Sequence, residues 1–362
     1  MNAVNTFLLN YNRQQSDFFR SPDEVARRSL YLAHHPTQVK VQKCMDGRVN
    51  VPVMTDNEVP MGIIAPYRNM GGKFKIGSQN FAHYVRNFYE HVLRAMEKDR
   101  CPGGLDISTY HYSASDSHCG CKGFNYDTGA AREFTAALVK KFNEIYGATH
   151  QVVHAIQMGV ETDKDAFVFH GDVPGTTLDI AEALDLSKSE LEARMRVLYP
   201  DMKDEVFRDL MPFAIGNQRH VRKVIESNRP IEHLDHAEQI IAVGRGFDWL
   251  HLTNKALIVG PFSIDWVNEV IVAAKIVLSN FENGRIPKED GAVLLVSAPF
   301  RKYGVDAAIA KEKAIETARV SLEAIKEHVP ELLAYDLELV VGTFDRNTML
   351  MERIEQEAAI AA

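Results

Sequence analysis

The residues best suited to chemistry are thiols, imidazoles and charged side chains in the first third of the chain. Cys44, Asp46 and Arg48 form a C-x-D-x-R pattern directly after a β-rich segment. A second segment, residues 111–121, contains two histidines and ends in Cys121. Two thiolates and one imidazole are a ligand set suited to zinc. Since catalytic zinc sites use three protein ligands and keep the fourth position for water, the pattern predicts an open zinc site.

The charged pair would complement such a site. Asp46 and Arg48 are two residues apart, so they lie on the same side of an extended segment and can form an ion pair beside the metal. Arg48 would then keep the Asp46 carboxylate from taking the open position. Zinc lowers the pKa of a bound water to about 7 and so supplies hydroxide at neutral pH.

Each of these residues has a simpler explanation when taken singly. A cysteine with apolar neighbours, such as Cys44, is usually a small core residue, and most of the 14 histidines must be surface or core side chains. Cys119 and Cys121 could also form a structural zinc knuckle or a dithiol. A structural site is normally closed by four ligands and needs neither Asp46 nor Arg48. The combination therefore favours the open site.

Alternating strands and helices must position these residues. Strand-like segments are expected at residues 39–44, 61–67, 105–113 and 150–161, and a helix at about 129–146. Strands that alternate with helices predict an α/β fold with a mainly parallel sheet. Cys44 would end one strand, and the loop rich in cysteine and histidine would follow another.

The second half of the chain repeats this order. GGLDISTYHYS, a helix and HQVVHAIQMGVETDKD correspond to GAVLLVSAPFR, a helix and LELVVGTFDRN. This repetition suggests an internal duplication of one α/β unit, with the accidental likeness of two strand–helix–strand units as the alternative. All four cysteines belong to the first copy. Only that copy can therefore hold a thiolate metal site.

These patterns predict a division of the chain. Residues 1–35 would form a helical extension, 36–236 the metal-binding catalytic domain, and 237–362 a metal-free duplicated α/β domain. Within the catalytic domain, residues 172–232 are expected to form a helical insert. Three helices are expected there, the last two separated by a Gly-Asn break at 216–217.

Composition excludes several classes of function. The 362 residues are 46% hydrophobic and 25% charged, which suits a globular protein with a sizeable core. A net charge of −8 leaves no basic surface for nucleic acid or an anionic membrane. No apolar run approaches a membrane span, and the N-terminus does not have the pattern of a signal peptide. We therefore expect a cytoplasmic protein that acts on a small molecule.

The motifs taken together resemble a known family. CMDGR, then APYRNMGG with Arg68-Asn69, then HCGC resemble the β-class carbonic anhydrases, with their C-x-D-x-R, R-N-x-G and H-x-x-C patterns. The similarity is closer to the epsilon-type shell carbonic anhydrase of carboxysomes, over about residues 38–350. YHYSASDSHCGC, MGVETDKDAFVFHG and DHAEQIIAVGRGFDWLHLTN carry it. That group fuses a catalytic copy to a second copy that has lost its zinc site.

The resemblance implies reversible hydration of carbon dioxide by zinc-bound hydroxide. Its ligands would be Cys44, Cys121 and one histidine. The H-x-x-C pattern of ordinary β-class enzymes would select His118, whereas the shell group takes the histidine at the end of the Y-H-Y-S strand, which is His111. We favour His111, because a sheet positions a residue at a strand end better than a loop does. The resemblance also implies a role for His236, in the H-A-E segment, in proton movement or in ordering the water of the site, with Asp46 and Arg48 as the other catalytic residues. The alternative is a histidine at a helix start between two domains.

The resemblance leaves some expectations open. A related hydrolase of carbonyl sulfide or carbon disulfide, or a non-catalytic zinc-binding scaffold, is the alternative function. We expect a homo-oligomer. Only about 35 residues precede the first expected strand, so we expect the chain to lack the long N-terminal helical domain of the shell enzymes. Location in a carboxysome is therefore the alternative to a cytoplasmic location.

Overall fold

The computed structural model describes residues 3–98, 100–147, 152–229, 236–250, 252, 254–260 and 265–355. Contacts divide the chain into two units. We call Ala26–Cys44 with Val49–Leu234 the six-stranded unit. Met1–Val25, Met45–Arg48 and Asp235–Ala362 form the five-stranded unit. Among the described residues, no helix combines the length and the apolar character needed to cross a bilayer.

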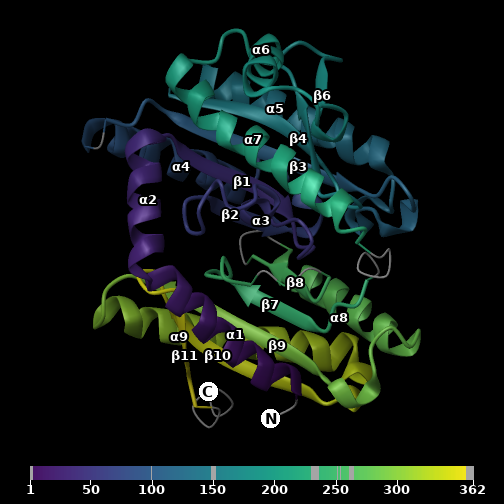
Figure 1. Cartoon of the computed structure of the whole chain (residues 1–362). Coiled ribbons are helices and arrows are strands. Elements are labelled where there is room, and N and C mark those ends of the chain that lie inside the picture. Colours follow the sequence, from purple (N-terminus) through teal and green to yellow (C-terminus); the bar gives the residue numbers. More distant parts are fainter. Residues whose placement is uncertain are drawn as a thin grey trace. The chain divides into compact units, whose positions relative to one another are not determined.

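The six-stranded unit is built on one mixed sheet with the order β2-β1-β3-β4-β5-β6 (Figure 1). Its strands are β1 (Gln38–Cys44), β2 (Ala65–Asn69), β3 (Gly104–Tyr112), β4 (Val153–Glu161), β5 (Ala166–His170) and β6 (Thr177–Asp179). The first four are parallel, and β5 and β6 are antiparallel additions. The parallel strands therefore end at one edge of the sheet.

Helices cover both faces of this sheet. They are α3 (Val51–Met54), α4 (Gln79–Lys98), α5 (Thr128–Tyr146), α6 (Lys188–Leu198) and α7 (Asp204–Glu226). Contacts divide α2 (Pro22–His34) between the two units after Val25. Side chains alternate along a strand, so Val41 and Ile107 join the apolar core that includes residues of α3, α6 and α7. On the other face Asp106 meets Tyr84 of α4 and Tyr146 of α5.

The five-stranded unit has the order β11-β10-β9-β7-β8. Its strands are β7 (Ile240–Gly244), β8 (Ala256–Val259), β9 (Ala292–Phe300), β10 (Leu337–Asp345) and β11 (Leu350–Arg353), and its helices are α1 (Ala3–Arg20), α8 (Trp266–Glu282) and α9 (Val305–His328). All neighbours are parallel except β10 and β11. The Asn12 side chain of α1 bonds to Met349 O and Met351 N, and so covers the edge at β11.

The two sheets repeat one plan, as the sequence predicts. The run β2-β1-β3-β4-β5 and the run β8-β7-β9-β10-β11 share both their order and their directions. The predicted α/β fold with a mainly parallel sheet and a second α/β domain is confirmed.

Some local predictions were wrong. The expected break at 216–217 is absent, because α7 runs through it. Gly216 allows a close approach to the chain, since a Cβ there would lie 2.2 Å from Thr55 O. Buried Asn217 donates to Met54 O and Asp165 O and accepts from Phe167 N. Tertiary contacts therefore keep two poor helix formers inside one helix.

Other expected boundaries differ from the structure in detail. The strand expected at 61–67 begins only at Ala65. The insert expected at 172–232 includes β6 besides its helices, and its residues 230–232 lie outside the described residues. Within the expected extension at 1–35, contacts place Met1–Val25 in the five-stranded unit.

Candidate metal centre

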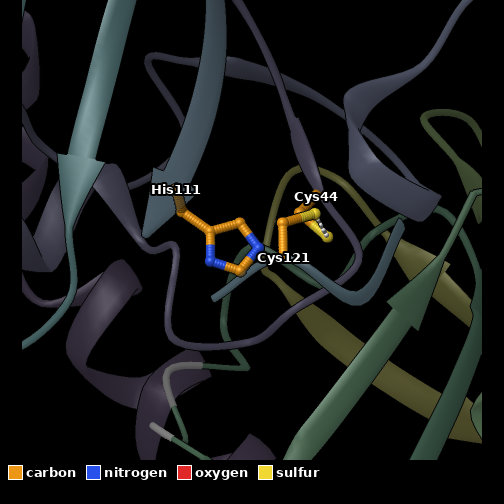
Figure 2. A group of neighbouring side chains, drawn as sticks. All are labelled: Cys44, His111 and Cys121. Carbon is orange, nitrogen blue, oxygen red and sulfur yellow. Dashed lines mark hydrogen bonds between the residues drawn. The ribbon is translucent and has the colours of Figure 1, made fainter. Parts of the chain in front are cut away.

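Three predicted ligands come together at the carboxyl edge of the six-stranded sheet (Figure 2). Cys44 is the last residue of β1, and His111 lies near the end of the neighbouring parallel strand β3. Cys121 follows in the connection between β3 and α5. All three residues are buried, and their ligand atoms lie within 4.8 Å of one another.

The geometry of this cluster fits zinc. The Sγ atoms of Cys44 and Cys121 are 3.9 Å apart. Tetrahedral zinc with Zn–S bonds of about 2.3 Å places two sulfur ligands about 3.8 Å apart. The donor set of two thiolates and one imidazole is also one that zinc prefers. The residues present therefore suit the metal without rearrangement of the two sulfurs.

The main chain around Cys44 is held by residues of the R-N-x-G segment. Gly71 N–H points at Cys44 Sγ from 3.4 Å, a contact that favours a thiolate. Gly71 has φ +70°, and a Cβ there would crowd the Phe124 ring at 3.0 Å. The Arg68 guanidinium donates to Cys44 O at 3.1 Å and to Val49 O at 3.0 Å. Arg68 thus joins the two ends of the loop 45–48.

The other candidate ligands lie elsewhere. The His118 side chain is 82% exposed and contacts Asp116 at 3.2 Å. Cys119 Sγ is 3.8 Å from the Asp116 carboxylate. Of the two histidines considered from the sequence, the structure brings His111 to the thiols.

Asp46 and Arg48 form the predicted ion pair inside the five-stranded unit. Arg48 Nη2 lies 2.7 Å from Asp46 Oδ2, and Nε lies 3.1 Å from both carboxylate oxygens. The backbone N–H of Arg48 donates to Asp46 Oδ1 at 2.9 Å. Both side chains are buried. Such a bidentate pair fixes the direction of the carboxylate.

His236 belongs to the same unit and is held by a residue that the sequence analysis missed. Its Nδ1 lies 2.8 Å from Oε1 of Glu238, a side chain with 0% exposure. Asn280 Nδ2 donates to Glu238 Oε2 at 3.1 Å. The spacing H-x-E, which places both side chains on one side of an extended segment, is the signal that could have identified Glu238.

Asp46, His236 and Glu238 form a second compact cluster. One ligand atom from each lies within 4.8 Å of the others. Burial alone would lower the pKa of His236, but the hydrogen bond and the charge of Glu238 outweigh it and raise this pKa, with Arg48 lowering it and Asp46 raising it. Two carboxylates and one guanidinium carry a net negative charge, which a proton on His236 neutralises. The cluster is therefore neutral overall when His236 is protonated.

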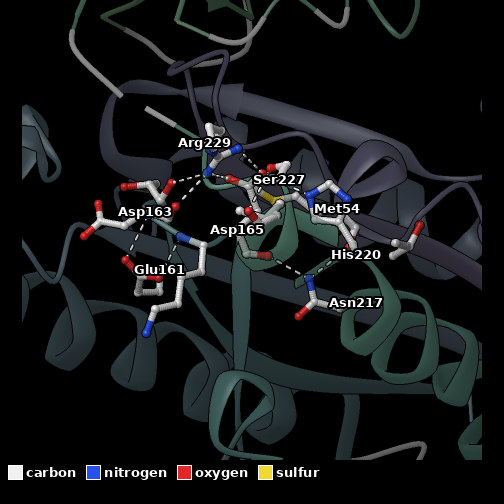
Figure 3. Close-up of polar contacts among 12 residues, drawn as sticks. Met54, Glu161, Asp163, Asp165, Asn217, His220, Ser227 and Arg229 are labelled. Carbon is white, nitrogen blue, oxygen red and sulfur yellow. Dashed lines mark hydrogen bonds and ion pairs between the residues drawn. The ribbon is translucent and has the colours of Figure 1, made fainter. Parts of the chain in front are cut away.

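A third polar group has a structural explanation (Figure 3). Asp165, in the turn between β4 and β5 with φ +57°, accepts from His220 at 3.0 Å and from Arg229 at 2.7 Å. Arg229 also donates to the main-chain oxygens of Thr162 and Asp163. The group ties this turn to the end of α7 and past it, and contributes no residue to either cluster above.

Comparison with known proteins agrees with the motifs. The family model described as carboxysome shell carbonic anhydrase, catalytic domain, matches residues 29–220, more than half of the chain. The match includes all three clustered ligands and the Asp46–Arg48 pair.

Two relatives carry the same name. The carboxysome shell carbonic anhydrase of Halothiobacillus neapolitanus is 22% identical over an alignment of 326 residues, and the match covers 81% of this chain and 62% of that protein. The one of Prochlorococcus marinus is 24% identical over an alignment of 241 residues, and the match covers 59% of this chain and 46% of that protein. The chain thus spans less than two thirds of either relative. On the match to more than half of its length, the chain belongs to the carboxysome shell carbonic anhydrase family.

Proposed function

We propose that the protein binds one zinc ion through Cys44, His111 and Cys121 and catalyses the reversible hydration of carbon dioxide to bicarbonate. The observation that carries this proposal is the buried cluster of two thiols and one imidazole, with two sulfurs 3.9 Å apart. Membership of a carbonic anhydrase family supports the choice of reaction. A donor set of three leaves a tetrahedral metal one further position.

The ligands must be in the right protonation state before the metal binds. Cys44 and Cys121 have to be thiolates, and His111 has to be neutral. The Gly71 N–H that points at Cys44 Sγ favours its thiolate. When bound, zinc supplies a coordinated water whose pKa is lowered to about 7. Acid should therefore release the metal.

Asp46 and Arg48 orient the reacting groups in this proposal. Arg48 engages both oxygens of the Asp46 carboxylate, so that Asp46 stays ionised and pointed in one direction. Asp46 follows Cys44 by only two residues, a span of at most about 7 Å. Its remaining acceptor positions suit a hydrogen bond from a hydroxyl group near the metal ligands.

His236 carries the proton that the reaction releases. Hydration of carbon dioxide to bicarbonate liberates one proton per turnover, and a histidine near neutral pH is suited to pass it to solvent. Glu238 holds Nδ1 of the ring, which leaves Nε2 to exchange the proton.

We also propose that residues 36–236 bear the metal and that 237–362 form a metal-free copy.

Two measurements test the proposal. Metal analysis should find about one zinc per chain. Stopped-flow hydration should be fast for the wild type and about 10²- to 10³-fold slower for Asp46→Ala, the range typical of the loss of one preorganised polar group. Background rates for both proteins would contradict the proposal and favour a zinc-binding scaffold. Faster turnover of carbonyl sulfide or carbon disulfide than of carbon dioxide would identify the related hydrolase.

Location and assembly follow from the relatives only as proposals. Both relatives are named as carboxysome shell proteins, which supports a place in that compartment over a dispersed cytoplasmic one. We also propose a homo-oligomer. Cofractionation of the chain with shell particles, and its mass in solution, check these two points.

A further inference from the structure

The loop that carries the Asp46–Arg48 pair is paired with an edge strand of the metal-free copy. Ile258 N donates to Met45 O at 2.7 Å, and Gly47 N donates to Ala256 O at 3.0 Å. Asp46 forms an antiparallel bridge with Leu257. By contacts, Met45–Arg48 belongs to the five-stranded unit, although Cys44 and Val49 on either side of it belong to the six-stranded unit.

The strand that receives the loop is suited to this task. β8 is the outer strand of its sheet and pairs with β7 on its other side. An outer strand presents main-chain donors and acceptors at fixed spacing, ready to pair with another segment. Met45–Arg48 pairs with this edge, and its main chain is therefore held by the same kind of hydrogen bonds that hold a strand in a sheet.

Gly47 makes the close approach possible. A Cβ at this residue would lie 2.5 Å from Ala256 O and 3.4 Å from Leu252 O. Gly47 is not among the glycines with positive φ. The absence of a side chain, and not a left-handed backbone, is therefore what this position requires.

The pairing bears directly on the ion pair. Asp46 and Arg48 flank Gly47. The Asp46 carboxylate accepts hydrogen bonds from both the side chain and the backbone N–H of Arg48. Arg68 holds the two ends of the loop through Cys44 O and Val49 O, while β8 holds its middle. The direction of the Asp46 carboxylate therefore depends on both.

We propose that β8 is a positioning element for the reaction: its main chain aligns the loop Met45–Arg48 and thereby the Asp46 carboxylate. The catalytic part of this inference rests on the proposed function, and the pairing itself does not. Through β8 the copy without candidate metal ligands then contributes main-chain geometry to the reaction, besides the Glu238 side chain that holds His236. Residues Ala256 and Ile258 act as positioning residues, because they reach the reacting groups only through the loop.

Hydrogen exchange of the wild-type, zinc-loaded protein tests the pairing without any substitution. The amides of Gly47 and Ile258 should exchange at least about 100-fold more slowly than in an unstructured peptide, as amides in stable pairing do. Exchange of both at the rate of an open loop would overturn the proposal. This result is independent of whether the protein hydrates carbon dioxide.

Gly47→Ala tests the consequence for catalysis, with Gly129→Ala as the matched control. At Gly129, in the first turn of α5, the one contact of a new Cβ within 4 Å is the side-chain oxygen Asp127 Oδ1 at 3.2 Å, and no main-chain atom from elsewhere in the chain lies that close. Gly47→Ala should keep the wild-type zinc content, exchange faster at Ile258, and lose at least about tenfold in kcat with little change in KM. The control should keep all three values.

Three outcomes would decide against the proposal. One is a wild-type kcat in Gly47→Ala despite faster exchange at Ile258. Another is loss of zinc from this variant, which would show that the loop acts through Cys44 and not through Asp46. The third is the open-loop exchange described above, which applies even if Gly47→Ala does not fold. A wild type with no hydration activity would remove the proposed function and leave the pairing to be judged by exchange.

Discussion

The two sheets follow one plan of strands but differ at the edge where the metal cluster lies. β1 ends in Cys44, whereas β7 ends in Gly244. Aligned by these strand ends and by the pairing register, His111 on β3 corresponds to Ala298 on β9. The connection that carries Cys121 spans residues 113–127, and its counterpart spans only 301–304. Every ligand position of the first copy is therefore absent from the second.

The difference is one of backbone geometry as well as of residue type. Gly244 has φ +132°, and a Cβ there would lie 1.9 Å from Ser297 O. No cysteine fits that position unless the turn is rebuilt. The second sheet nevertheless keeps its strand order and directions. The fold and the candidate metal site are thus separable, and the fold alone does not specify the function.

The sheet interiors differ in the same sense. Lys40 pairs with Asp106 in the first copy, where the second copy pairs Ile240 with Val293. The buried Asp106 carboxylate accepts from Gln42, Tyr84 and Tyr146. Burial raises the pKa of Asp106, against the lowering effect of Lys40 and these three partners. The first copy therefore carries polar networks that specify its packing, whereas the second relies on apolar contacts at the same level.

The largest expected effect is loss of the metal from Cys44→Ser. Removing one of the three proposed ligands should reduce the zinc content from about one per chain to below about a tenth. The reason is that the affinity of the site for zinc depends on every ligand. Metal analysis after dialysis measures it. Cys101→Ser is the matched control, because Cys101 is a buried thiol that donates to Gly103 O. Stoichiometric zinc in Cys44→Ser would show that Cys44 is not a ligand, and the difference between the two copies at this strand end would then not concern metal binding.

Much of this contrast was predictable from the sequence. The strands that end at Cys44 and near His111 have local β patterns, and parallel strands end at one edge, so the meeting of these two residues followed from the predicted fold. That Cys121 joins them was implied by the resemblance. Glu238 was missed although the spacing H-x-E places its side chain on the same side of the segment as that of His236, because the sequence does not indicate its burial against Asn280. Long-range packing decided these features, and local periodicity does not report it.

Two further features lay beyond the sequence for the same reason. A Gly-Asn pair usually marks a break, but contacts with Thr55 and Met54 carry α7 through Gly216 and Asn217. The pairing of Met45–Arg48 with β8 joins residues about 200 positions apart in the chain. Nothing in the local sequence C-M-D-G-R indicates that partner.

A smaller effect is expected from Glu238→Gln. This change tests the proton group of the five-stranded unit, whereas Cys44→Ser tests the candidate metal ligands of the six-stranded unit. Glu238 raises the pKa of His236 and burial lowers it, so without the charge of Glu238 burial should bring this pKa below its ordinary value. Proton release should become rate-limiting, so kcat should fall several-fold while kcat/KM holds. NMR titration of His236 and stopped-flow rates measure the two effects.

The control for this change is Glu269→Gln, a buried acidic residue of α8 in the same unit. Added imidazole buffer should restore kcat in Glu238→Gln, because an external proton carrier then replaces His236. An unchanged pKa of His236, or a kcat that buffer cannot restore, would speak against a proton role for this group.

A still smaller effect concerns stability in acid and separates β5 from β11. β5 ends in His170, and β11 contains no histidine. Burial, with the charge of Arg132, lowers the pKa of His170 to about 4. Between pH 6.5 and 4 the unfolded chain therefore binds a proton that the folded chain does not. Stability should fall by up to about 3 kcal/mol across this range, with no further loss from His170 below it.

His170→Gln should reduce this acid dependence. The His170 ring contacts the Tyr110 hydroxyl at 2.9 Å, and glutamine can keep a hydrogen bond there without titrating. Urea unfolding of both proteins at pH 7.0 and 4.5 gives the comparison, and release of metal by acid affects both alike. Equal losses of stability in the two proteins would show that His170 does not contribute.

The smallest expected effect is that of Cys119→Ser. Cys119 is two residues from Cys121, yet its Sγ lies 3.8 Å from the Asp116 carboxylate and the ligand cluster comprises three other residues. Zinc content should stay at the wild-type value, and hydration rates should stay within about twofold under reducing conditions. Loss of zinc would make Cys119 a fourth ligand. A site with four protein ligands has no position for water. The first copy would then differ from the second by holding a structural metal, and the difference would not concern catalysis.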